Sequence, residues 1–309
     1  MKTPVVFLIF NRPDLTAKVF EAIRCAQPEV LLIVADSPRV SHPGDVEKCS
    51  AARLVTERVD WPCKVLRNYS DTNLGCRRRV ASGLTWAFQQ VSEAIVLEDD
   101  CLPDPTFFPF CERMLEMYRD DKRVMMVTGI NFLGEWKAER QSYHFACSGS
   151  IWGWASWRRA WDLYDENMVL WKDEEVRNRL RDVYCDDKAF ELRRKPFDEI
   201  VAGRLDTWDY QWTFARLIQS GLSIVPCRNI VSNIGFRSDA THTKRGAPRG
   251  CGTLQKIDFP LVSPPCVVPD REYEHNLTTL LSSAESANER DPLQPKRSFI
   301  RELWIRLSS

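Results

Sequence analysis

Hydrophobic and polar positions alternate in blocks over residues 1–131. Short, almost continuous apolar runs, typical of buried strands, are separated by longer segments whose apolar positions recur at helical spacing. Strands separated by helices in this way are typical of a parallel sheet covered on both faces. The sequence therefore predicts an α/β fold with a mostly parallel sheet flanked by helices. The expected strands are 4–10, 30–35, 63–67, 94–97 and 123–128. The first expected helix is capped by Asp14 and turns Leu15, Val19, Ala22 and Ile23 inward. The other expected helices are 46–59, 77–91 and 106–119.

The residues just after these strands are polar, and in parallel sheets ligands bind at the carboxyl ends of the strands. Asp36 is suited to a base or a ribose hydroxyl. The turn at 73–75, with arginines 77–79 behind it, is suited to a diphosphate, although a solvated helix face explains the arginines equally well and Gly75 also suits a plain turn. The candidates here are Asn11, Arg12, Asp36, Asn73, Gly75 and Arg79.

The fourth expected strand ends on three carboxylates, Glu98, Asp99 and Asp100. Adjacent carboxylates repel one another, so burying them requires a cation or hydrogen-bond donors nearby. Strand alternation places Glu98 and Asp100 on one face and Asp99 on the other. Hard oxygen ligands suit Mn²⁺ or Mg²⁺, and Mg²⁺ usually combines one or two carboxylates with substrate phosphates. A solvated acidic loop is the alternative.

The region from 132 to about 227 loses this alternation and is rich in tryptophan. Trp154 and Trp208 are candidates for stacking on a sugar acceptor, with core packing as the alternative. Asp209 lies among aromatic residues, which tend to raise a carboxylate pKa toward that of a general base. The alternative is helix capping by Asp206, with Asp209 in a nearby salt bridge. His242, in a polar segment, is a candidate for the metal or a phosphate, or a surface histidine.

Composition narrows the function classes. The 43 basic and 43 acidic residues balance, which gives no global case for a nucleic-acid partner. No apolar run approaches the roughly 20 residues that cross a bilayer. Eleven scattered cysteines indicate reduced thiols and a cytoplasmic protein. The basic amphipathic pattern at 296–307 suits docking on protein, or peripheral contact with the inner face of a membrane.

Several motifs together resemble a known family. They are Asn-Arg-Pro after the first strand, an Asp after the second, and Glu98-Asp99-Asp100 followed by Pro-Asp-Pro and a Phe-Phe pair. Further along come Gly153-Trp154, Trp208-Asp209 and a loop from Gly235 to His242. Over about residues 4–243 the chain resembles glycosyltransferases of the GT-A fold, especially the N-acetylglucosaminyltransferase I type, with kinship to family 2 glycosyltransferases.

The resemblance implies a metal-dependent, inverting transfer of a sugar from a nucleoside-diphosphate sugar, with UDP expected, to a saccharide, lipid-linked saccharide or other hydroxyl acceptor. By the resemblance, Asp100 binds the metal, Glu98 and Asp99 contact the sugar and ribose of the donor, and Asp209 deprotonates the acceptor. The chain lacks the anchor and disulfide setting of the animal enzyme, so neither its acceptor nor its donor sugar is carried over.

Two other functions compete with this interpretation. A sugar-nucleotide nucleotidyltransferase also uses strand-end carboxylates, but it normally has a glycine-rich loop where this chain has residues 11–14. A catalytically silent carbohydrate-binding protein would retain only the fold. The expected organisation is a nucleotide-sugar-binding half (1–131), an acceptor-binding and catalytic half of the same domain (132–245), and a C-terminal extension (246–309).

Overall fold

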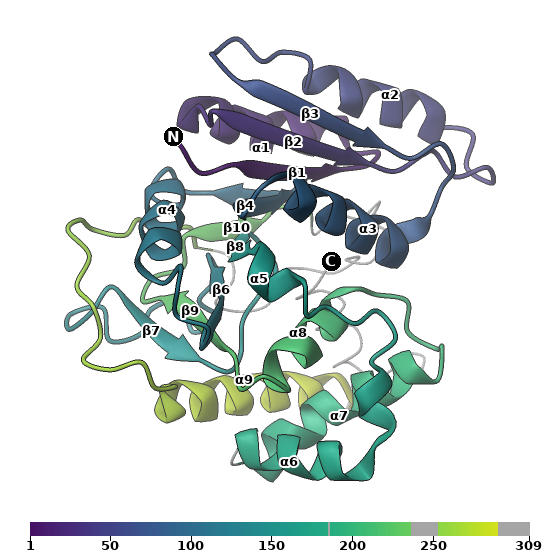
Figure 1. Cartoon of the computed structure of the whole chain (residues 1–309). Helices are drawn as coiled ribbons and strands as arrows, with labels where there is room; N and C mark the ends of the chain where they lie inside the picture. The colour runs from purple at the N-terminus through teal and green to yellow at the C-terminus, as the bar shows by residue number, and fades with distance from the viewer. Residues whose placement is uncertain (185, 236–252, 290–309) are drawn as a thin grey trace.

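A computed structural model describes residues 1–184, 186–235 and 253–289, and the main feature of these ranges is an eight-stranded sheet (Figure 1). Its strand order is β3-β2-β1-β4-β8-β6-β9-β7. The strands are β1 (Val5–Ile9), β2 (Val30–Ala35), β3 (Lys64–Tyr69), β4 (Glu93–Glu98), β6 (Val124–Thr128), β7 (Tyr143–Ala146), β8 (Trp154–Trp157) and β9 (Leu222–Pro226); β5 (Cys101–Pro103) and β10 (Val231–Asn233) form a separate antiparallel pair.

The first four strands in sequence, β1 to β4, run parallel to one another, and the sheet becomes mixed beyond β4. Strand β8 runs antiparallel to both β4 and β6, and β7 runs antiparallel to β9. Every residue of β1 is buried, as expected for a central strand that is covered on both faces. The predicted α/β class, with a mostly parallel sheet flanked by helices, is confirmed.

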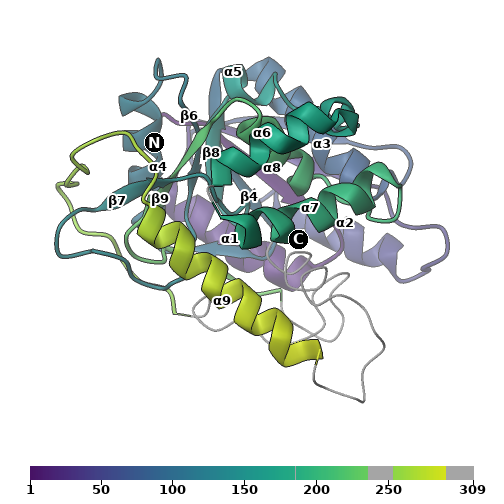
Figure 2. The ribbon, with the colours of Figure 1, turned by 90° about the horizontal axis from the view of Figure 1, so that it is seen from below.

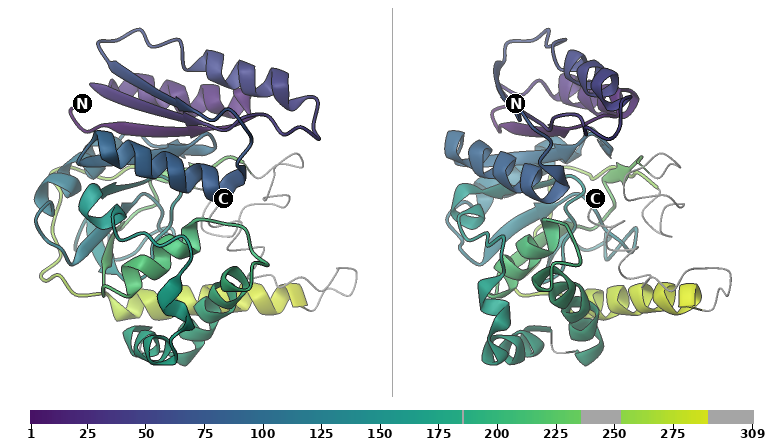
Figure 3. Two further views of the ribbon diagram at one scale, coloured as in Figure 1. Left: turned by 45° about the vertical axis from the view of Figure 1, so that its right-hand side comes forward. Right: turned by 90° about the vertical axis from the view of Figure 1, so that its right-hand side faces the viewer.

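Helices cover the parallel half on both faces. Helices α1 and α2 pack together on one face, and α3 lies on the other (Figure 3). Helices α6 to α9 gather beside the far half of the sheet, where α9 contacts α7 and β7 (Figure 2). The helices are α1 (Pro13–Ala26), α2 (Asp45–Val55), α3 (Gly75–Gln90), α4 (Phe107–Met117), α5 (Arg158–Trp161), α6 (Glu174–Tyr184), α7 (Asp187–Val201), α8 (Asp209–Leu217) and α9 (Arg271–Glu289), with a 3₁₀ turn at Val169–Lys172.

Two local features differ from the sequence predictions. Helix α1 begins at Pro13, with Arg12 at the N-cap position and no side-chain cap, so Asp14 is not the capping residue. Proline suits the first helical position because it has no N–H to leave unpaired. The β5–β10 pair was not predicted, and it brings residues 231–233 directly alongside the end of the acidic triplet.

Within the described ranges, no helix combines the length and the apolar character that a bilayer-spanning segment requires. The amphipathic segment 296–307 lies outside the described residues, and so does His242.

Candidate functional site

A pocket opens at the carboxyl ends of β1, β2 and β4. Its volume is about 180 Å³, below the ~300–1,000 Å³ typical of sites that enclose a drug-sized ligand. It can therefore enclose only part of a nucleotide-sized molecule. Seven residues predicted to bind a donor line it: Arg12, Asp36, Asn73, Gly75, Arg79, Glu98 and Asp99.

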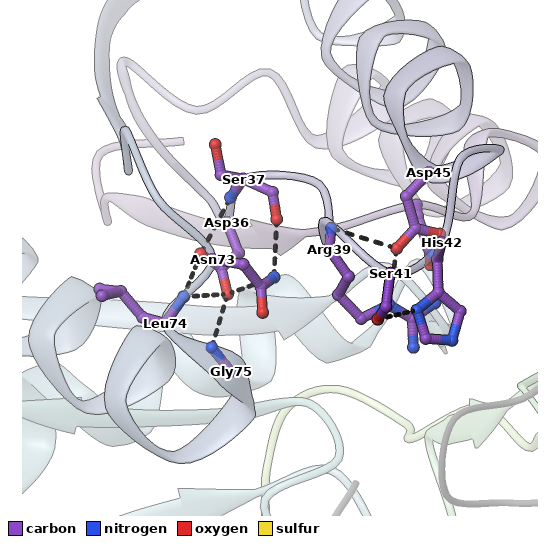
Figure 4. A network of polar contacts seen from close by, with 10 residues as sticks. Asp36, Ser37, Arg39, Ser41, His42, Asp45, Asn73, Leu74 and Gly75 are labelled. Atoms are coloured by element: carbon purple, nitrogen blue, oxygen red, sulfur yellow. Dashed lines mark hydrogen bonds and ion pairs between the residues drawn. The ribbon is translucent and has the colours of Figure 1, made fainter.

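Asp36 ties the end of β2 to the start of α3 (Figure 4). Its carboxylate accepts hydrogen bonds from the main-chain N–H groups of Leu74 (3.0 Å) and Gly75 (2.9 Å), and from the Asn73 side chain (3.2 Å). Gly75 has a φ of +76°, a conformation that favours glycine. The carboxylate thus lies on the amino end of α3, where the helix dipole stabilises negative charge. Asp36 and Asn73 hold this loop in place, and their contact with a base or ribose stays a prediction.

A second polar cluster joins Arg39, which lines the pocket, to Asp45 (Figure 4). Arg39 Nε donates to Asp45 Oδ2 at 2.6 Å, and Asn11 Nδ2 donates to Asp45 Oδ1 at 2.8 Å. These bonds, that of Arg39 first, lower the pKa of Asp45 to about 2. Asn11 is thereby directed to α2 and does not line the pocket. Arg39 also lies over the Phe10 ring, 5.5 Å from its centroid.

Phe10 and Arg39 both line the pocket, and sequence reasoning did not select them. Phe10 was counted as the last residue of an apolar strand. Its position directly before Asn11 and Arg12, at a strand end, was the signal that it lies at the site. Arg39 carries no comparable signal, because its neighbours in sequence form an irregular loop.

Arg79 is buried and holds two strand ends together. Its Nε donates to Ala35 O at 3.1 Å and its Nη2 donates to Asn68 O at 2.6 Å. Burial lowers the pKa of Arg79. The guanidinium therefore fixes the ends of β2 and β3 beside α3, and diphosphate binding by Arg79 stays a prediction.

The acidic triplet is held by Arg12. Strand β4 ends at Glu98, and the next two residues form a turn. The Arg12 guanidinium contacts Asp99 Oδ1 through Nη2 and lies 2.8 Å from Asp100 Oδ2 through Nη1. The prediction that Asp99 and Asp100 point in opposite directions is therefore wrong, because the turn ends the alternation of the strand before it reaches them.

The positive charge of one guanidinium does not balance three carboxylates, and the pKa values of these groups show the excess of negative charge. Burial, followed by repulsion from Asp100, raises the pKa of Glu98 well above its ordinary value. Burial raises the pKa of Asp99 to about 6, even though Arg12 acts in the opposite direction. Burial alone would lower the pKa of Arg12, but attraction to Asp100 and Asp99 outweighs it and raises that pKa.

A divalent cation fits this triplet only with further ligands from water or a substrate. Glu98 Oε1 is buried and has no hydrogen-bond partner in the part of the chain that the structure describes. That acceptor, with the excess of negative charge, suits a cation. Among the same described residues, however, no three Asp, Glu, His or Cys side chains are placed to enclose a metal ion. The remaining ligands would be water molecules or phosphate oxygens, as is usual for Mg²⁺.

Asp209 is the first residue of α8 and is only 3% exposed. Its carboxylate accepts a hydrogen bond from the Thr207 hydroxyl. After burial and the nearer charges, Asp209 also contributes to the raised pKa of Glu98, so the two carboxylates are close enough to repel one another. The structure thus brings the predicted base near the pocket that Glu98 lines.

Trp154 and Trp208 are fully buried and pack against each other, with ring centroids 6.0 Å apart. Trp161 and Trp212 complete the cluster. Neither Trp154 nor Trp208 has a face open to solvent, so their placement corresponds to core packing and does not support the prediction that they stack on an acceptor. The cluster supports Asp209, because α8 supplies both Trp212 and that carboxylate.

Comparison with known proteins finds no matching family model and no matching curated protein. Similar solved structures include the galactosyltransferase LgtC in complex with donor and acceptor sugar analogs, at 9% identity and a TM-score of 0.39, covering 90% of this chain and 95% of that one. UDP-glucose pyrophosphorylase complexed with UDP-glucose has 10% identity, a TM-score of 0.36 and coverage of 75% and 93%. HddC from Yersinia pseudotuberculosis has 10% identity, a TM-score of 0.34 and coverage of 53% and 81%.

Proposed function

We propose that this protein is a glycosyltransferase of the GT-A type, which moves a sugar from a nucleoside-diphosphate sugar, with UDP as the expected nucleotide, to a hydroxyl of a saccharide or lipid-linked saccharide. The observation that carries the proposal is the pocket at the carboxyl ends of three parallel strands, which is bordered by an acidic triplet with Asp99 and Asp100 buried. Open α/β sheets bind ligands at this edge. The carboxylate cluster there has an excess of negative charge, which favours a cationic or metal-bound ligand.

The proposed reaction is an inverting displacement. Asp209 accepts the proton of the acceptor hydroxyl while that oxygen forms a bond to the anomeric carbon of the donor sugar. The bond from the same carbon to the phosphate oxygen breaks, and the nucleoside diphosphate leaves with the bonding electron pair. Glu98 and Asp99, which line the pocket, are the proposed contacts to the sugar and ribose.

Asp100, with Glu98 beside it, is the proposed holder of Mn²⁺ or Mg²⁺. When bound, such an ion neutralises negative charge on the departing diphosphate. The chain's own contribution is to bury the carboxylates and to keep Arg12 beside them: Asp100 is 0% exposed and Asp99 is 2% exposed. This arrangement keeps water away from the carboxylates and the guanidinium beside which the donor would bind.

The test is product analysis with a panel of nucleotide sugars and simple saccharide acceptors, in the presence of Mn²⁺. The proposal expects release of a nucleoside diphosphate that depends on the donor sugar and rises with the correct acceptor. Formation of pyrophosphate from a nucleoside triphosphate and a sugar 1-phosphate would instead identify a nucleotidyltransferase. Binding without turnover of any donor would indicate a silent carbohydrate-binding protein.

A further inference from the structure

Arg12 bridges the two most deeply buried acids of the triplet. It is the N-cap residue of α1, shortly after β1, and its guanidinium contacts Asp99 and lies 2.8 Å from Asp100 Oδ2. The Arg12 side chain is 24% exposed, whereas its two partners are 2% and 0% exposed. Arg12 also lines the pocket. The guanidinium therefore lies between the buried carboxylates and the place where a ligand would enter.

Each carboxylate oxygen of Asp99 and Asp100 already has a donor from the chain. The two oxygens that Arg12 does not contact accept from Phe10 N at 3.3 Å and from Cys101 Sγ at 3.5 Å. A divalent ion on Asp100 Oδ2 would lie next to the guanidinium, and two cations at contact distance in a poorly solvated site repel strongly. The ion and Arg12 therefore compete for the same oxygen.

The backbone at Gly235 closes the other approach to this ion pair. A Cβ atom at Gly235 would lie 2.2 Å from Asp100 Oδ2 and 3.0 Å from Arg12 Nη1, so the main chain packs directly on both groups. A hydrogen bond from Ile234 N to Asp100 O, at 2.8 Å, fixes this contact. Because the backbone occupies that side, an ion can reach the oxygen only at the expense of Arg12.

We propose that Arg12 is the resident counter-cation of the acidic triplet, and that a divalent ion reaches Asp100 only by displacing the Arg12 guanidinium. The inference rests on the proposed function in one respect, since it assumes that the triplet is where a metal acts. A guanidinium has five N–H donors and pairs well with phosphate oxygens, so a displaced Arg12 would be free to bind the anionic part of a donor at the pocket.

The test is a titration of the donor-free protein with Mn²⁺, followed by electron paramagnetic resonance of the free ion. Arg12→Met should bind Mn²⁺ at least about tenfold more tightly than the unaltered protein, because the competing cation is gone. The gain should disappear in the double variant Arg12→Met with Asp100→Asn. Arg39→Met is the matched control: it removes another arginine of the same pocket, one that is paired with Asp45, and should leave the Mn²⁺ affinity unchanged.

A second variant keeps the test decisive if Arg12→Met does not fold. Arg12→Lys retains the positive charge but cannot bridge two carboxylates with a planar fork, so it should tighten Mn²⁺ binding by a smaller factor. Unchanged or weaker Mn²⁺ affinity in whichever of the two variants folds would overturn the inference. The titration uses no nucleotide, so a failure of the proposed donor chemistry would leave its outcome unaffected and would be seen separately, in the product analysis.

Discussion

Asp36 and the acidic triplet are both buried at the carboxyl ends of neighbouring parallel strands, but the chain treats them differently. The single carboxylate of Asp36 accepts main-chain hydrogen bonds from the amino end of α3 and a further bond from Asn73. In the triplet, one guanidinium pairs with both Asp99 and Asp100, and Glu98 Oε1 lacks a hydrogen-bond partner among the described residues.

We propose that this difference separates a structural carboxylate from a functional one. Fold stability favours buried charges that are fully hydrogen-bonded, as Asp36 is. A cluster that keeps excess negative charge lowers stability, and natural proteins tolerate such strain mainly where a ligand relieves it. We therefore expect variants at Asp36 to affect folding, and variants at the triplet and at Asp209 to affect binding and turnover.

The largest effect is expected from Asp209→Asn. The change keeps the size of the side chain and removes the proposed base, so turnover should fall by about 10²- to 10⁴-fold while donor binding stays nearly intact. Steady-state kinetics and calorimetric donor binding measure the two quantities. Asp206→Asn, in the same segment, is the control and should keep most of the activity. Full activity of Asp209→Asn would show that another group is the base.

Asp36→Ala should lower the free energy of unfolding by about 2–3 kcal/mol, because it leaves the N–H groups of Leu74 and Gly75 without their acceptor. Urea unfolding measures this loss. The Mn²⁺ affinity of the folded variant should be unchanged. Loss of Mn²⁺ binding without loss of stability would show that Asp36 serves the metal site and not the fold.

Asp45 is a second carboxylate that stabilises the fold, and its contribution to stability depends on pH. Its pKa of about 2, set first by the hydrogen bond from Arg39, lies below that of an unfolded aspartate, so its stabilisation is present above about pH 4 and is lost as the pH falls toward 2. Asp45→Asn should lower the unfolding free energy by about 1–2 kcal/mol at pH 6. Chemical unfolding at several pH values should show this gap narrowing below pH 4; a gap that widens there would contradict the assignment.

Asp99→Asn should have the smallest effect on stability, within about 1 kcal/mol, because relief of repulsion offsets the weakened contact with Arg12. Thermal unfolding of the donor-free protein measures it. The same variant should clearly weaken donor binding. A large loss of stability would mean that the triplet is as fully satisfied as Asp36.

The sequence predicts the parallel half closely because local information is sufficient there. Residues 30–35 read as a buried strand and form β2 with those bounds, and polar residues at strand ends converge by the general rule for parallel sheets. Half of the pocket lining, seven of fourteen residues, could be named in advance for this reason.

Other features depend on contacts between distant residues, which no local pattern encodes. Arg12 and Asp100 are 88 positions apart, so the ion pair between them follows from the pairing of β1 with β4 and not from either motif. Strands β5 and β10 have only three residues each and pair across more than a hundred positions. From the sequence, Trp154 and Trp208 fit a core role as well as a binding role. Only the packing of α8 against β8 distinguishes the two roles.

The central claim, that the pocket and the triplet bind a nucleoside diphosphate, is tested most directly by calorimetric titration with UDP, GDP, CMP and dTDP, each with and without Mn²⁺. The account predicts that one nucleoside diphosphate, with UDP expected, binds tightly in the presence of Mn²⁺ and much more weakly in its absence. No binding of any of the four nucleotides with Mn²⁺ present would contradict it.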